Sequence, residues 1–160
     1  MKIIFNLALL FGILLSAGCY KKDQQPLEQA TFETVCTDKY APFYDERKYS
    51  RFHHVAFTGY LATPKSVMVS NTMSVYVYGK PNREGEKILA SFRVGSRDNH
   101  VERLKSGYKD SDMKIKSDTG AILGDGSKVT IEGDVSPGAI PGKPMDRPCL
   151  VSVDKVVAAN

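Results

Sequence analysis

Tryptophan is absent from this chain of 160 residues, and cysteine occurs only three times. Eight tyrosines and seven phenylalanines therefore supply all of its aromatic side chains. Long hydrophobic runs are also lacking, because the most apolar stretch, residues 3–15, is shorter than the ~20 residues that a transmembrane helix needs. The chain is 42% hydrophobic and 25% charged, which predicts one packed domain with appendages.

Catalytic motifs are lacking as well. No serine is framed as Gly-x-Ser-x-Gly, and there is no glycine-rich phosphate loop. Residues 118–121 read Asp-Thr-Gly-Ala, the short signature of retroviral-type aspartic proteases, but Lys116 and Ser117 stand where that family has a hydrophobic strand. The 40 residues after Gly120 are too few for the rest of such an enzyme. We interpret Asp118 as a turn residue and predict that the protein is not an enzyme.

The three histidines do not form a metal-binding pattern. His53 and His54 are adjacent, so in a strand their side chains point to opposite faces. His100 lies elsewhere in the chain, and no Cys/His spacing of a zinc site occurs. The sequence therefore predicts neither a metal site nor a cofactor.

The N-terminal segment has the features of a lipoprotein signal. Lys2 precedes the apolar run, and residues 15–19 read Leu-Ser-Ala-Gly-Cys. This stretch resembles the lipobox of bacterial lipoproteins, with Ser16 in place of the commoner leucine. The resemblance implies that residues 1–18 are a signal peptide and that Cys19 is acylated, with chains such as palmitate, on its sulfur and then its amine. Several acyl chains would anchor the protein to a lipid bilayer. The alternative is a plain secretory signal with a coincidental cysteine.

The same resemblance sets the expected location. Residues 19–31 are polar and have no apolar period, so we expect a flexible tether. Tyr20 is not the aspartate that retains some lipoproteins in the inner membrane, which favours the periplasmic face of the outer membrane. Removing residues 1–18 lowers the formal net charge from +4 to +3, because one lysine and no acid is lost. This weakly basic charge permits an anionic partner without requiring nucleic acid.

Two further cysteines, Cys36 and Cys149, remain after Cys19. Disulfides persist in the cell envelope outside the cytoplasm, so one bridge between them is the simplest expectation. The bridge would close a loop of more than 100 residues and contribute up to ~4–5 kcal/mol in the chain-entropy model. The alternative is a pair of unbridged small core residues.

Alternating apolar residues predict five strands, at residues 55–61, 73–78, 88–94, 129–135 and 150–157. Gly59 in the middle of the first strand indicates a bend or bulge. The positions that alternation turns inward in the first three strands are Val55, Phe57, Gly59, Leu61, Met73, Val75, Val77, Ile88, Ala90, Phe92 and Val94.

The segments between these strands have weaker signals. Residues 100–105 predict a short helix that ends near Gly107. Residues 113–123 predict a hairpin about residues 118–120, and the proline-rich residues 136–148 predict a loop. The aromatic residues of 32–52 are expected to cover the core, and an aromatic-basic ligand platform is the alternative.

This order resembles the OB-fold, an all-β, five-stranded Greek-key barrel with a helix between the third and fourth strands. The resemblance covers residues 53–157, within a domain that we place at residues 32–160. It extends to bacterial envelope OB-fold lipoproteins, some of which are described as nucleic-acid-binding. Fold alone does not determine function.

The OB-fold resemblance also indicates a binding surface, since the outer face of the second and third strands binds oligonucleotides or oligosaccharides in that fold. Here that face would carry Tyr76, Tyr78, Ser91 and Arg93, with Tyr60 of the first strand nearby. Tyrosines stack on bases or sugars, although tyrosines that merely cover the sheet are the alternative. We expect a binding module for single-stranded nucleic acid or glycan. The competing hypothesis is an assembly protein that docks onto another envelope protein.

Overall fold

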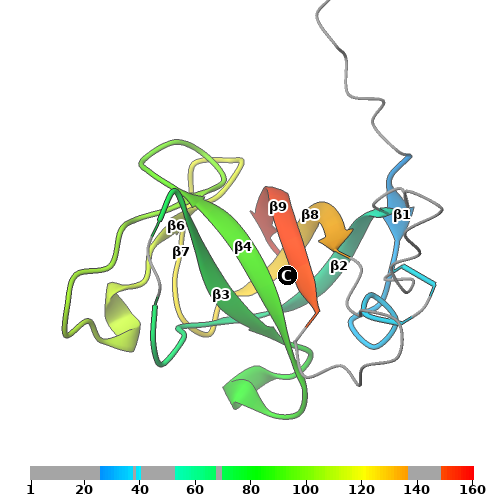
Figure 1. The fold of residues 1–160 in the computed structure, drawn as a ribbon, viewed down its shortest axis with the longest axis horizontal. Coiled ribbons are helices and arrows are strands. Elements are labelled where there is room, and N and C mark those ends of the chain that lie inside the picture. Colours follow the sequence, from blue (N-terminus) through cyan, green and yellow to red (C-terminus); the bar gives the residue numbers. More distant parts are fainter. Residues whose placement is uncertain (1–25, 38, 41–52, 68–69, 137–148) are drawn as a thin grey trace, which may run out of the picture.

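The computed structural model describes residues 26–37, 39–40, 53–67, 70–136 and 149–160 (Figure 1). The predicted signal peptide, Cys19 and nearly all of the predicted loop at 136–148 lie outside the described residues. Within the described ranges, no helix is both long enough and apolar enough to cross a membrane.

The described chain consists of strands and short turns. The five long strands are β2 (His53–Ala62), β3 (Thr72–Tyr78), β4 (Lys87–Val94), β8 (Lys128–Ser136) and β9 (Leu150–Ala158). The four short strands are β1 (Glu28–Gln29), β5 (His100–Val101), β6 (Ile115–Lys116) and β7 (Ile122–Leu123). Two 3-10 turns, η1 (Pro81–Arg83) and η2 (Asp110–Asp112), lie in the connections.

The five long strands close into a barrel. Strand β2 pairs with β3 and β8, β3 pairs with β4, and β9 joins β4 to β8. Every pair in this ring is antiparallel except β4 with β9, which is parallel. The all-β, five-stranded closed barrel that the sequence predicts is therefore confirmed.

Gly59 lies where β2 passes from one partner strand to the other. Residues up to Tyr60 pair with β8, and Tyr60–Ala62 pair with β3. A Cβ atom at Gly59 would lie 2.6 Å from Cγ1 of Val77 and 2.9 Å from the carbonyl oxygen of Tyr78. The close approach of the two strands at this corner needs a residue without a side chain.

The core follows the predicted alternation. Met73, Val75 and Val77 of β3 are fully buried, and the other residues predicted to point inward in the first three strands are buried too, except Val94, which is only partly buried. Phe57 and Phe92 are the largest buried side chains. Burial of each such side chain stabilises the fold by about 1.5–3 kcal/mol.

The helix predicted over residues 100–105 is wrong. His100 and Val101 form β5, which runs parallel to the end of β4 and antiparallel to β6. The amide of Gly95 donates to the carbonyl oxygen of Val101 (3.0 Å), and the amide of Glu102 donates to that of Lys114 (2.8 Å). These backbone groups are thus bonded to other strands rather than within a helical turn. The hairpin predicted at residues 113–123 is confirmed by the pairing of β6 with β7.

The N-terminal part of the described chain packs on the barrel. Glu28 and Gln29 are predicted to lie in the tether, but they form β1, which pairs in parallel with β2 and belongs to the sheet. Tyr40 is 2% exposed, and its hydroxyl donates to the carbonyl oxygen of Gln29 (3.1 Å). Tyr40 and Phe32 therefore cover the core, whereas the aromatic residues of 41–52 lie outside the described residues.

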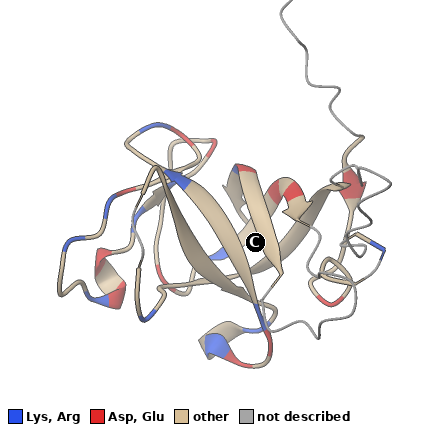
Figure 2. Ribbon diagram, viewed as in Figure 1, with Lys and Arg blue, Asp and Glu red and all other residues tan. Residues whose placement is uncertain are grey.

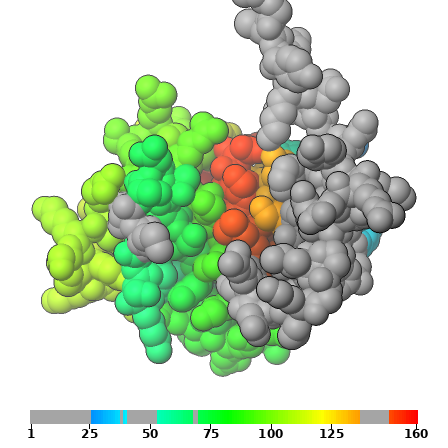
Figure 3. Space-filling view, in the orientation of Figure 1, coloured from blue at the N-terminus to red at the C-terminus, as the bar shows by residue number. Residues whose placement is uncertain are grey.

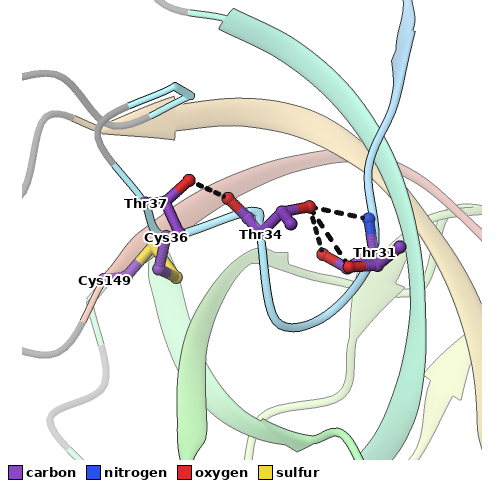
Figure 4. Close-up of a disulfide and its surroundings, with 5 residues drawn as sticks. All are labelled: Thr31, Thr34, Cys36, Thr37 and Cys149. Atoms are coloured by element: carbon purple, nitrogen blue, oxygen red, sulfur yellow. Dashed lines mark hydrogen bonds between the residues drawn. A yellow bond between two sulfur atoms is a disulfide. The ribbon is translucent and has the colours of Figure 1, made fainter.

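A disulfide joins Cys36 to Cys149, with their Cα atoms 5.7 Å apart (Figure 4). The predicted bridge is confirmed, and the alternative of two unbridged cysteines is wrong. On the Cys36 side, the Thr37 hydroxyl donates to the carbonyl oxygen of Thr34 (2.7 Å), and the Thr34 hydroxyl accepts from the Thr31 amide (3.1 Å). The bridge ties this hydrogen-bonded turn to the residue before β9.

Candidate functional site

Three tyrosines lie together on the outer face where β2 meets β3. Tyr60 is directly opposite Tyr78, and Ala62 is directly opposite Tyr76. Because directly opposite residues point to the same side of a sheet, the three rings share one face. All three are half-buried, as the predicted alternation requires. In the space-filling view, β3 and β4 form a continuous surface that meets β9 (Figure 3).

The structure does not bring the predicted Arg93 to these tyrosines. Arg93 is opposite Thr72, and Ser91 is opposite Ser74, whereas Tyr76 is opposite Leu89. Arg93 lies four positions beyond Leu89, or about 13 Å along the strand. The predicted set is thus spread along β4, with the tyrosines beside its start, Ser91 in its middle and Arg93 near its end.

Lys87 supplies the positive charge beside the tyrosines. It lies opposite Tyr78, and its Nζ lies 4.2 Å from the centroid of the Tyr76 ring. This cation–π contact contributes ~0.5–1 kcal/mol at an exposed position. Lys87 is not among the predicted site residues, because alternation predicts that the third strand begins one residue later, at Ile88. Figure 2 shows that basic residues mark both ends of β4, while the strands of this face are otherwise largely uncharged.

The connection between β3 and β4 places a second cation next to the tyrosines. One Arg83 guanidinium nitrogen lies 2.6 Å from Asp110 Oδ2 and 2.8 Å from Asp125 Oδ1. Asp125 also accepts a hydrogen bond from the Thr63 amide (2.7 Å). Burial alone would lower the pKa of Arg83, but Asp125 and Asp110 outweigh burial and raise the pKa above its ordinary value.

The backbone that carries Arg83 is strained. Asn82 and Arg83 both have left-handed conformations, with φ of 58° and 62°, which cost about 1–3 kcal/mol each in residues other than glycine. The two ion pairs hold this turn in place. Sequence periodicity cannot reveal the cluster, because its three charged residues come from three separate loops.

A hollow of about 170 Å³ lies between the tyrosines and this turn, lined by Tyr60, Leu61, Tyr78, Asn82, Arg83, Asp125 and Gly126. Pockets that enclose a whole small molecule usually measure ~300–1,000 Å³. The smaller hollow therefore fits one group of a longer ligand. A wider hollow of about 590 Å³ continues past Tyr78 and Arg83 towards the disulfide and includes Phe32 and Lys87.

Tyr108 lies near Asp110 and Tyr76. Its hydroxyl donates to the Pro64 carbonyl oxygen (2.6 Å). Burial raises the pKa of Tyr108, and the negative charge of Asp110 and the nearby Tyr76 raise it further. Because its hydroxyl is already bonded to the backbone, we assign Tyr108 a structural role.

Asp118, His53 and His54, which the sequence offers as candidates for catalysis or metal binding, lie away from the tyrosines. Asp118 accepts from the Asn99 side-chain amide (3.0 Å) beside the β6–β7 hairpin, as a turn residue would. Nδ1 of His53 lies 2.8 Å from Glu28, and Nδ1 of His54 lies 3.0 Å from Asp134. The two neighbouring imidazoles thus have different partners.

The chain matches no protein-family model and no curated protein. The geometry of the tyrosine face is therefore the basis for assigning a function.

Proposed function

We propose that the protein is a membrane-anchored, non-catalytic OB-fold module that binds an extended oligosaccharide. The ring order of the five strands and the parallel β4–β9 pair support the OB-fold. In that fold the outer face of the second and third strands, here β3 and β4, is the usual binding surface.

The observation that carries the proposal is the group formed by Tyr60, Tyr76 and Tyr78. Tyr60 and Tyr78 line a hollow that suits one group of a longer ligand, and the half-buried Tyr76 lies two residues from Tyr78 on the same face. An aromatic ring offers an apolar face and, in tyrosine, a hydroxyl that bonds to a polar partner. Such rings stack on the planar bases of nucleotides and on the apolar faces of sugars.

The charges around the hollow favour a sugar over a nucleic acid. Asp110 and Asp125 both contact one nitrogen of the Arg83 guanidinium, so their negative charges offset its positive charge and weaken its attraction for a phosphate. The two carboxylates would also repel a phosphate. Sugar hydroxyl groups, in contrast, both donate to carboxylates and accept from a guanidinium or from Lys87.

The location inferred from the N-terminus agrees with this ligand class. The lipobox resemblance supports acylation of Cys19, attachment to a bilayer and a position in the cell envelope, where glycans are structural polymers. Cys19 and the signal peptide lie outside the described residues.

Docking onto another envelope protein is the competing function. Among the described residues, the large apolar side chains left exposed are Leu27 and Ile122. They belong to separate parts of the chain and do not form a contiguous apolar patch, which a docking surface usually has. The tyrosine face is thus better suited to ligand capture.

The test is a titration of neutral envelope oligosaccharides and of single-stranded oligonucleotides into the full chain in detergent. We expect an oligosaccharide to bind, and the double change Tyr76→Ala with Tyr78→Ala to weaken binding at least tenfold, because each stacked ring contributes ~1–3 kcal/mol. The matched control is Thr58→Ala with Thr130→Ala, a hydrogen-bonded pair across β2 and β8. Unchanged binding in the tyrosine variant, or binding of oligonucleotides alone, would reject the proposal.

A further inference from the structure

A second group of polar side chains lies on the other half of the barrel. His54 of β2, Asp134 of β8 and Asp154 of β9 come from three adjacent strands. Nδ1 of His54 lies 3.0 Å from Asp134 Oδ1 and 3.8 Å from Asp154 Oδ2. One nitrogen and two carboxylate oxygens thus lie within 4.8 Å of one another. The side chains of His54 and Asp134 are each only 18% exposed, so the group opens to solvent at Asp154.

A bulge in β9 lies at the second carboxylate. Glu132 pairs with Lys155, but the next residue of β8, Gly133, pairs with Val153. Asp154 is therefore an extra residue between two ladder positions, and bulges are frequent near functional sites. Ser152 pairs with Asp134, which pairs with His54, and Asp154 lies two residues after Ser152, so alternation puts Asp154 on the same outer side as His54.

Gly133 allows the two strands to approach closely at this point. A Cβ atom there would lie 2.2 Å from the carbonyl oxygen of Ser152, a distance that no real side chain permits. The backbone next to Asp134 thus combines a bulge with an obligatory glycine. The carboxylate of Asp134 thus lies within a long strand of the barrel, β8, rather than in a loop.

We propose that His54, Asp134 and Asp154 bind a divalent transition metal of the Zn²⁺ class. One imidazole and two carboxylates are a ligand set that Zn²⁺ accepts, and three protein ligands leave a fourth position open. Tetrahedral ligands at ~2.1 Å from Zn²⁺ are about 3.4 Å apart. The two separations from His54, 3.0 Å and 3.8 Å, bracket that value, and the two carboxylate oxygens lie within 4.8 Å of each other, so the side chains would need to close around the ion.

The metal would act as a clip between strands. Its ligands lie on β2, β8 and β9, which are consecutive in the ring, so a bound ion would link all three. A ligand that binds only the folded state raises stability by mass action. His54 and Tyr60 are six residues apart on β2, or about 20 Å, so this site is separate from the tyrosine face and does not depend on the proposed function.

The test is thermal unfolding and calorimetric titration of the full chain in detergent with Zn²⁺ alone. We expect Zn²⁺ in large excess to raise the unfolding midpoint by roughly 5–10 °C. Asp154→Asn should remove this shift and weaken Zn²⁺ binding at least about tenfold, since it deletes one ligand. Asp154 is half exposed, so the variant should still fold.

The control is Glu102→Gln, which removes one negative charge from an exposed residue outside the cluster and should behave as the unmodified chain. Cys19 is present in every variant and cannot account for a difference between them. His54→Gln removes a second ligand and should likewise abolish the Zn²⁺-induced rise of the unfolding midpoint. An equal Zn²⁺ shift in the Asp154→Asn chain would mean adventitious binding elsewhere, and no shift at millimolar Zn²⁺ would mean that the cluster is an ordinary ion pair. Either result overturns the proposal.

Discussion

At the scale of single residues, the tyrosine face depends on polar contacts that hold its surroundings. Arg83 is fixed by two carboxylates, and Tyr108 is fixed by the Pro64 carbonyl oxygen. These contacts come from loops, yet they border a face made by strands. The loops therefore determine the shape of the hollow, and the strands determine where the rings lie.

The raised pKa of Tyr108 leads to a prediction about alkaline stability. Its ordinary value is 10.0, and burial is the main cause of the increase. Above pH ~10 the unfolded chain loses this proton first, so the folded state binds more protons and stability falls as the pH rises. We expect Tyr108→Phe to flatten that fall, and to cost about 0.5–1.5 kcal/mol at neutral pH through the lost hydrogen bond.

The measurement is urea unfolding of both chains between pH 8 and 11, with the disulfide intact. The quantity compared is the slope of unfolding free energy against pH above pH 10. Parallel slopes in the two chains would show that other groups cause the alkaline loss of stability.

Some of these residues can be found from sequence and others cannot. Alternation places Tyr76 and Tyr78 outside because Met73, Val75 and Val77 must face the core. It gives no information about Arg83, Asp110 or Asp125, because loop residues have no period. His54 illustrates the same limit. Its direction relative to His53 follows from the strand, but its two carboxylate partners depend on register and on a bulge.

At the scale of elements, the long strands are predictable and the short ones are not. Each long strand has several alternating positions, so a shift of one residue would expose its apolar side. Val101 and Leu104, in contrast, are spaced by three, which suits a helical face and equally suits β5 with its following turn. Pairing with the end of β4 decides the outcome. Strand β1 has no apolar pattern and exists because β2 offers it a parallel edge.

The disulfide gives the element-scale prediction. It links the segment after β1 to the start of β9 across a sequence separation of 113 residues. Replacing both Cys36 and Cys149 by serine should lower the free energy of unfolding by about 2–5 kcal/mol, mainly because the unfolded chain gains freedom. Urea unfolding of the two chains measures the difference, with Cys19 retained in both.

Removing the bridge should act on the unfolded chain and leave the folded barrel unchanged. The loop closed by the bridge contains β2, β3, β4 and β8, so the barrel itself should keep its strand content when the bridge is removed. Circular dichroism in the absence of denaturant is the control. A serine variant as stable as the unmodified chain would show that strain in the folded state cancels the entropic gain.

At the scale of the whole molecule, the barrel separates two surfaces. The tyrosine face lies over β2, β3 and β4, and the His54 cluster lies over β2, β8 and β9. Only β2 belongs to both surfaces. It is also the strand that contains Gly59, where two strands of the barrel approach closely. The proposed metal site on one half would therefore stabilise the scaffold without occupying the surface that we propose for ligand binding.

The proposed membrane anchor gives the prediction at this scale. A single acyl chain binds a bilayer only marginally, at ~0.8 kcal/mol for each buried CH₂ group, whereas several chains hold a protein firmly. We therefore expect Cys19→Ser to move the protein from the membrane fraction to the soluble fraction and to abolish labelling by a palmitate analogue. The variant with serine at Cys36 and Cys149 is the matched control, and it should stay with the membrane because those sulfurs are bonded to each other. Soluble protein from the unmodified chain, or continued labelling of Cys19→Ser, would contradict the lipoprotein assignment and leave both barrel surfaces to be tested in a secreted protein.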